Sequence, residues 1–147
     1  MPQRELKWTA GRIWEFLAAE FPQVLAAGYR VERLEHRRAA VGLAVGTDHL
    51  RPGGSVSGPA LMGLVDFTCY VLLLAHHGAA AGLTVTTGLH ISFLSKAGLE
   101  DVVCEAELLK HDRTLSVLDC RIVTAGGRLI AHAEATYFMA GAGDVSG

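Results

Sequence analysis

The sequence has little excess charge and few cysteines, and each shortage excludes a class of function. Its 147 residues carry a formal net charge of −2, and the basic residues are scattered. The concentrated positive surface of a nucleic-acid-binding protein is therefore missing, and we expect no nucleic-acid partner. Cys69, Cys104 and Cys120 show no C-x-x-C spacing and lie in apolar or alternating stretches. They indicate small core residues in a reducing compartment, with neither a disulfide nor a zinc site.

Long uncharged apolar segments and a phosphate-binding loop are also lacking. The N-terminus, MPQRELKW, has no secretory signal, and no segment offers eighteen uncharged apolar residues. We therefore expect no membrane partner and a cytoplasmic location. The stretch PGGSVSG lacks the Lys and Ser/Thr that close a nucleotide-binding loop, which disfavours nucleotide hydrolysis. His76 and His77 have no partner at metal-ligand spacing, so we expect no metal.

Apolar residues, in contrast, are plentiful. Hydrophobic residues make up 50% of the chain, while its length matches one typical domain. This share exceeds what a single core of this size needs, so part of the apolar surface should be buried against another subunit. We expect a homo-oligomer, either a dimer or a dimer of dimers.

The first half of the chain predicts helices on either side of a strand pair. Apolar residues at mostly helical spacing predict an amphipathic helix over residues 5–21. Two stretches within residues 29–45 favour strands that form a hairpin across Arg37 and Arg38. A long apolar helix should then begin with Gly58 as N-cap and Pro59 at the first helical position. We expect it to end between Gly78 and Gly82.

Four stretches with a strand period follow this helix: TVTTGLHISFL, VVCEAELLKH, LSVLDCRIV and RLIAHAEATYFM. The strands are consecutive and their links are short, so the sheet should be antiparallel. A helix that is apolar on most sides fits being wrapped by that sheet, which predicts an α+β fold. We assign residues 1–28 to an N-terminal helix and linker of the same domain, residues 29–139 to its main part, and residues 140–147 to a flexible tail.

One carboxylate, Asp66, stands within the apolar run SGPALMGLVDFTCYVLLLA. An ionised carboxylate in dry surroundings costs several kcal/mol unless it is paired, so Asp66 needs a structural or a chemical reason. The structural alternative is a buried acid bonded to backbone or to Thr68. The chemical alternative is a catalytic carboxylate.

The residues around Asp66 carry a resemblance to a known family. The run R-P-G-G-S-V-S-G-P-A-L-M-G-L-V-D and the later stretch LHISFLSKA resemble the hotdog-fold acyl-CoA thioesterases of the PaaI-like group over residues 29–138. The resemblance implies a hotdog fold and hydrolysis of an acyl-coenzyme A to a free acid and CoA. It places Asp66 on the catalytic acid and Gly58 on the glycine whose backbone N–H polarises the thioester carbonyl. Thr86 falls where a Ser or Thr often orients the attacking water.

The same resemblance implies a set of substrate-binding residues. Lys96 falls near a basic residue that often meets the phosphates of coenzyme A, and Arg51 and Ser57 replace an Asn and a His of the family pattern. Ser57 can still donate one hydrogen bond. We add Arg113 as a further candidate, although Arg51, Lys96 and Arg113 can equally be solvated surface charges. Thr86 can likewise be an ordinary strand residue.

Two other functions stay open beside the thioesterase. A hotdog hydratase or dehydratase would carry a paired histidine and acid, but Ser57 stands at the position of the loop histidine that this pair requires. A non-catalytic acyl-CoA-binding or regulatory protein is suggested by the replacements at Ser57 and Arg51.

The helix itself offers the chemistry of a thioesterase without a cofactor. Its N-terminus carries free N–H groups and a partial positive charge, which suit a developing oxyanion. A thiolate leaves readily, so an oxyanion donor and a carboxylate acting as nucleophile or base suffice. Gly58 and Asp66 are eight residues apart, or roughly 12 Å along a helix axis. They cannot both reach one carbonyl, so we expect a site shared between protomers.

Overall fold

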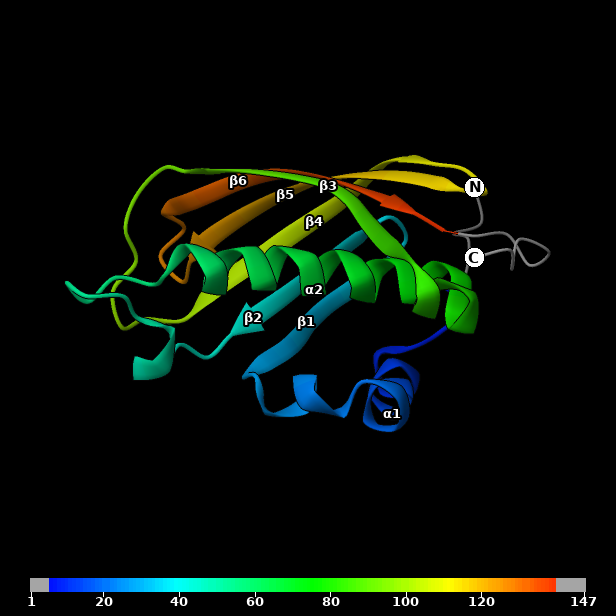
Figure 1. Ribbon diagram of the computed structural model, residues 1–147, viewed down its shortest axis with the longest axis horizontal. Helices are drawn as coiled ribbons and strands as arrows, with labels where there is room; N and C mark the ends of the chain where they lie inside the picture. The colour runs from blue at the N-terminus through cyan, green and yellow to red at the C-terminus, as the bar shows by residue number, and fades with distance from the viewer. Residues whose placement is uncertain (1–5, 140–147) are drawn as a thin grey trace.

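The computed structural model describes residues 6–139, so the predicted tail at residues 140–147 lies outside the described residues. A six-stranded antiparallel sheet curves around one long helix, α2, with a second helix, α1, beside it (Figure 1). The elements are α1 (Ala10–Glu20), β1 (Tyr29–Glu35), β2 (Arg38–Leu43), α2 (Gly58–His77), β3 (Val85–Phe93), β4 (Val102–His111), β5 (Leu115–Thr124) and β6 (Leu129–Phe138). The predicted α+β architecture, a sheet wrapped around one apolar helix, is confirmed.

The sheet has the strand order β1-β2-β4-β5-β6-β3, and every neighbouring pair is antiparallel. The predicted hairpin across Arg37 and Arg38 is present. Arg37 has a φ of 65° between β1 and β2, and Gly127 has a φ of 87° between β5 and β6. Although β3 directly follows α2 in the chain, it pairs with β6 and forms an edge of the sheet.

Helix α2 is apolar because the sheet covers most of its circumference. More than half of its 20 residues are buried, among them Leu64, Leu72 and Leu74. By length and composition, the segment Gly58–Leu83 could cross a membrane, but 61% of the tested window is buried within the protein. Packing against the sheet therefore accounts for its apolar character.

The N-terminus of α2 differs from the prediction by one residue. Ser57, not Gly58, is the N-cap, because the Ser57 hydroxyl accepts a hydrogen bond from the Ala60 N–H at 3.2 Å. Gly58 is thus the first helical residue and Pro59 the second. A hydroxyl satisfies a free N–H group that glycine has no side chain to satisfy, so serine takes the cap. The other end is as predicted, with Gly78 at the C-cap and a φ of 65°.

Small residues let the sheet approach α2 closely. On β6 the inward positions are Ala131, Ala133 and Ala135, all buried. The three cysteines are buried and free, and the Sγ atoms of Cys69 and Cys120 lie 3.4 Å apart. The cysteines are therefore core residues, as predicted.

Helix α1 begins later than predicted. It starts at Ala10, because the Thr9 side chain caps it by accepting from the Arg12 N–H at 3.2 Å. The predicted start, Glu5, lies outside the described residues. The preceding residues instead bond to the end of α2, since the N–H groups of Lys7 and Trp8 both donate to Ala75 O. Ile13 and Leu17 bury one face of α1 in the core shared with α2.

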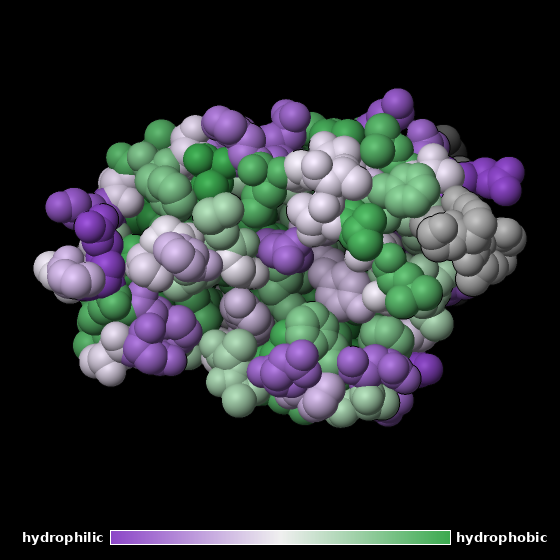
Figure 2. Space-filling view, in the orientation of Figure 1, coloured by the Kyte–Doolittle hydropathy of each residue, from purple (hydrophilic) through white to green (hydrophobic). Residues whose placement is uncertain are grey.

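One stripe of α2 and the β3 edge stay uncovered in the single chain. Met62 is 38% exposed and Asp66, one turn later, is also exposed. In the single chain Asp66 is therefore not the buried acid of the structural alternative, because the sheet and α1 cover the other sides of the helix. Most strongly hydrophilic side chains gather around the periphery of this face, and hydrophobic or weakly polar ones fill much of its middle (Figure 2).

Candidate active site

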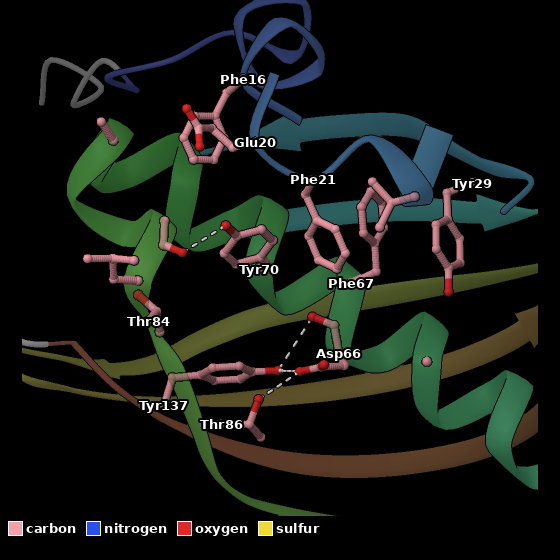
Figure 3. A pocket seen from close by; sticks show the side chains of 15 residues that line it. Phe16, Glu20, Phe21, Tyr29, Asp66, Phe67, Tyr70, Thr84, Thr86 and Tyr137 are labelled. Carbon is pink, nitrogen blue, oxygen red and sulfur yellow. Dashed lines mark hydrogen bonds between the residues drawn. The ribbon is translucent and has the colours of Figure 1, made fainter. Parts of the chain in front are cut away.

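The carboxylate of Asp66 is held by two hydroxyl groups (Figure 3). The Thr86 Oγ1–H donates to Asp66 Oδ1 at 2.9 Å, and the Tyr137 hydroxyl donates to the same oxygen at 2.6 Å. Within residues 6–139, no hydrogen-bond partner is found for Asp66 Oδ2. Hydrogen bonds to an ionised carboxylate are among the stronger ones in proteins. One carboxylate oxygen is thus fixed, and the other has no partner among the described residues.

The sheet register brings the two hydroxyls together. Thr86 on β3 lies directly opposite Tyr137 on β6, so the two side chains share the face toward α2. The ladder is irregular between Thr86 and Gly88, at the start of the exposed edge strand. Three elements that are distant in sequence therefore meet at one carboxylate.

The structure brings the predicted pair Asp66 and Thr86 together. It does not support the structural alternative with Thr68, because the Thr68 hydroxyl donates to Leu64 O at 2.7 Å within the helix. Sequence reasoning missed Tyr137. Its signal was the strand alternation of residues 129–138, which puts one large polar side chain on the inward face after three alanines.

Asp66 lies at the wall of a cavity of about 540 Å³ between α1, α2 and the sheet. The rings of six residues line much of this cavity: Phe16, Phe21, Tyr29, Phe67, Tyr70 and Tyr137. Tyr29 stacks on Phe67 with centroids 4.3 Å apart. Burial, and then the charge of Asp66, raises the pKa of Tyr29. The cavity is therefore largely apolar and aromatic, with the side chains of two acidic residues, Asp66 and Glu20, on its wall.

Gly58 lies in a second cavity, of about 440 Å³, which Arg51, Phe93 and Lys96 also line. A Cβ on Gly58 would meet the Phe93 ring at 3.3 Å, so the glycine gives room to that ring. In the part of the chain that the structure describes, the Gly58 N–H has no acceptor. The predicted donor and two predicted basic residues therefore share one cavity, separate from that of Asp66.

The other two predicted substrate-binding residues lie outside both cavities. Ser57 serves as the cap of α2, and its own N–H donates to His49 O at 2.8 Å. Arg113 lies in the turn between β4 and β5 and lines neither cavity. The structure therefore does not bring Arg113 together with the other predicted site residues.

Four histidines gather at the C-terminal end of α2. The rings of His36 and His111 lie 5.1 and 5.6 Å from that of His76, and the rings of His77 and His111 are 4.5 Å apart. Burial, with smaller contributions from neighbouring positive groups, lowers the pKa of His76 and of His77 to about 4. Across residues 6–139, no group of three ligating side chains could hold a metal ion.

Comparison with known proteins identifies the family. The family sequence model of the thioesterase superfamily matches residues 53–131 of this chain. These residues include Gly58 of one cavity and Asp66 of the other. A comparison with curated proteins gave no match.

Solved structures share the whole fold. A protein of Silicibacter sp. TM1040 to which thioesterase activity has been ascribed is 34% identical, with 92% of this chain and 94% of that chain covered and a TM-score of 0.82. A hypothetical thioesterase of Streptococcus pneumoniae TIGR4, crystallised with coenzyme A, is 25% identical over 77% of this chain and 89% of that one, with a TM-score of 0.69.

The phenylacetic acid degradation protein PaaI of Thermus thermophilus, in an Asn-to-Asp mutant form, is 24% identical over 80% of this chain and 98% of that one, with a TM-score of 0.71. At that identity the likeness shows a shared fold. The family match covers more than half of the chain, and the Silicibacter protein exceeds 30% identity over nearly all of it. The chain therefore belongs to the thioesterase superfamily and has its hotdog fold, as the resemblance predicted.

Proposed function

We propose that the protein is an acyl-CoA thioesterase that hydrolyses an acyl-coenzyme A to a free acid and CoA. Family membership supports thioester hydrolysis in general. The observation that carries the more specific proposal is the Asp66 carboxylate, which two hydroxyls hold by one oxygen at the wall of an aromatic cavity. An acyl group suits that cavity because its walls are largely apolar.

Asp66 Oδ2 is the reacting atom in this proposal. It attacks the thioester carbonyl carbon, or it takes a proton from a water molecule that attacks instead. In this proposal Thr86, whose hydroxyl donates to the same carboxylate, orients that water. The Gly58 N–H, at the positive end of α2, donates to the developing oxyanion. The thiolate of CoA then leaves. If Asp66 attacked, the acyl group remains on Asp66 as a mixed anhydride, which water hydrolyses to the free acid; if water attacked, the free acid forms directly. Neither route requires a metal or redox cofactor.

The CoA moiety is assigned to the second cavity. Arg51 and Lys96 line it and offer positive charge to the phosphates of the nucleotide. The presence of coenzyme A in the Streptococcus pneumoniae relative supports this class of ligand. Ser57, next to Gly58, can donate its hydroxyl proton to the substrate while its oxygen caps the helix. Arg113 takes part only if a partner subunit places it near the site.

A site shared between two protomers follows from the separation of the cavities. Strand β3 is an open edge, and Val85, Phe93 and Leu94 are each more than half exposed. Pairing of β3 with a second copy about its middle residue, Leu89, would set Thr86 of one chain near Phe93 of the other. That dimer would join the Asp66 of one protomer to the Gly58 of its partner and cover the exposed apolar side chains.

Subunit mixing tests the shared site. Asp66→Asn and Gly58→Pro protomers should each be inactive, and their mixture should regain thiol release, because one site of a mixed dimer keeps both intact groups. Proline is tolerated at the first helical position, which Gly58 occupies, and it removes the N–H under test. Because proline also adds a Cβ that meets the Phe93 ring at 3.3 Å, Gly58→Ala, which adds the same Cβ and keeps the N–H, is the control. Recovery reaches at most about half of the sites in a mixed dimer. No recovery despite exchange confirmed by mass would contradict a shared site.

The alternative function is non-catalytic binding of acyl-CoA. It is favoured by one observation, the engagement of Ser57 in helix capping at the position of the family histidine. The hydratase or dehydratase alternative lacks such support, because among residues 6–139 no histidine lines the cavity of Asp66.

A panel of short, long and aromatic acyl-CoAs, assayed with a thiol-trapping reagent, tests the proposed function. We expect thiol release from at least one member. Tight binding of acyl-CoA by the intact protein without thiol release from any member would instead favour the binding protein.

A further inference from the structure

We propose that Tyr137 is a positioning residue, which holds Asp66 by Oδ1 and thereby presents Oδ2 to the thioester. The inference deepens the proposed function and rests on it. Neither the family match nor the sequence pattern assigns a role to this tyrosine. The structure does so through one short hydrogen bond, 2.6 Å from the Tyr137 hydroxyl to Asp66 Oδ1.

The two donors on Asp66 are not equivalent. Thr86 lies on the exposed edge strand β3, where its hydroxyl can also bond to water. Tyr137 is only 3% exposed, and its ring is packed into the core. A largely buried hydroxyl has fewer alternative partners than an exposed one, so its bond to the carboxylate is the more persistent of the two. Tyr137 is therefore the group that fixes the orientation of Asp66.

The protonation state of Tyr137 suits this role. Burial raises the pKa of Tyr137 above its usual value, and the adjacent Cys69 and Asp66 raise it further. The phenol stays protonated over the working pH range and acts only as a donor to the carboxylate. A donor stabilises the ionised form of a carboxyl group, which is the form that serves as nucleophile or base.

The same cavity offers a matched control. Tyr70 also lines it and also uses its hydroxyl as a donor, but to the backbone Gly82 O at 3.0 Å. Its ring resembles that of Tyr137 in chemistry, and its hydroxyl has no bond to Asp66 in the described structure. Comparing the two Tyr→Phe variants separates the loss of a cavity hydroxyl from the loss of the bond to Asp66.

The test measures kcat, KM and the pH–rate profile of wild type, Tyr137→Phe and Tyr70→Phe. For Tyr137→Phe we expect kcat to fall between about tenfold and a hundredfold, as for a lost charged hydrogen bond. KM should change little, because Tyr137 acts through Asp66. The acidic limb of the pH–rate profile should move to higher pH, because the ionised carboxylate has lost a donor. In Tyr70→Phe the acidic limb should stay at the wild-type pH, whatever happens to KM.

A second pair of variants, with and without Tyr137→Phe in an Asp66→Asn background, separates the positioning of Asp66 from a purely structural effect of the Tyr137 substitution. Adding Tyr137→Phe to an Asp66→Asn background should cause no further loss of kcat, because the positioned carboxylate is already absent. A further tenfold loss in that background would overturn the inference, as would an unmoved acidic limb in Tyr137→Phe alone. Equal movement of the limb in Tyr70→Phe would also overturn it.

Failure of the proposed function gives a different result. If the wild type releases no thiol from any acyl-CoA, the proposed function is wrong, and carbon-13 NMR of the Asp66 carboxyl then decides the inference. Its titration should move to higher pH in Tyr137→Phe and not in Tyr70→Phe. An identical titration in wild type and Tyr137→Phe would show that the tyrosine does not act on the carboxylate.

Discussion

Acidification should destabilise the protein through the histidines at the end of α2. The Nε2 of His76 accepts a hydrogen bond from the Arg37 N–H at 3.0 Å, so protonation at that nitrogen removes the bond. The protonation of His76 is opposed by the positive charges of His36, His111 and Arg37. The protonation of His77 is opposed by those of Lys7 and His111. Burial adds to this repulsion and is the larger cause. Both imidazoles are therefore neutral in the folded protein at pH 5 and charged in the unfolded chain.

The magnitude follows from the two pKa values. The folded pKa of about 4 lies below the reference value of 6.5, so the unfolded state binds more protons between these values and stability falls as pH decreases. Between pH 7 and pH 5 the loss is about 2 kcal/mol for each histidine without screening. Both side chains are partly exposed, and halving the figure for solvent screening leaves about 1 kcal/mol each.

Urea unfolding at pH 7 and pH 5, at one protein concentration, measures this loss. The pH-dependent loss in free energy of unfolding should be about 2 kcal/mol smaller in the double variant His76→Gln, His77→Gln than in wild type. His132→Gln is the control, because His132 is a partly exposed histidine on β6 outside the cluster at the end of α2, with its Nε2 2.6 Å from Asp119 Oδ1. This variant should not reduce the pH-dependent loss in free energy of unfolding. An equal loss in wild type and the double variant would refute the reasoning.

Two further predictions concern the CoA cavity and the packing beneath α2. In steady-state assays, Lys96→Ala should raise KM for an acyl-CoA more than for a truncated pantetheine thioester, because only the acyl-CoA carries the nucleotide phosphates. Equal increases in the two KM values would show that Lys96 does not bind the phosphates of CoA. Ala133→Leu should lower the free energy of unfolding by about 1–3 kcal/mol in urea, because Ala133 is 1% exposed in the core between the sheet and α2. The exposed neighbour change Glu134→Gln should leave it nearly unchanged, and similar values for the two variants would contradict close packing at Ala133.

The fold was predictable because its elements have clear periods and clear ends. The apolar run after Pro59, the glycine at 78 and the strand alternation near the C-terminus each mark one element, and the structure has each of them. The N-termini of the helices depend on single capping side chains, which the hydrophobic periodicity of the sequence does not reveal. Ser57 caps α2 through its hydroxyl, so α2 begins at Gly58, one residue before Pro59. Thr9 caps α1 in the same way, so α1 begins at Ala10, five residues after Glu5.

The candidate site was predictable in part. Asp66 was conspicuous as one charge in an apolar run, but its exposure depends on which face of α2 the sheet leaves open, and the sequence of the helix alone does not contain that information. Tyr137 lies 71 residues from Asp66 in the chain, and only the pairing of β3 with β6 brings it to the carboxylate. The residue pattern therefore could not predict contacts that depend on the order in which the strands pair.

The central claim is that Asp66 performs thioester hydrolysis. Thiol release from the best acyl-CoA should be compared for wild type, Asp66→Asn and the control Asp48→Asn, whose side chain is 84% exposed and lines neither cavity. Asn has nearly the shape of Asp and keeps an oxygen for the Thr86 and Tyr137 hydroxyls, so the variant should fold. We predict that Asp66→Asn loses at least about a hundredfold of kcat, the scale of a lost general base, while Asp48→Asn keeps wild-type turnover. Near wild-type turnover by a folded Asp66→Asn protein would contradict the claim.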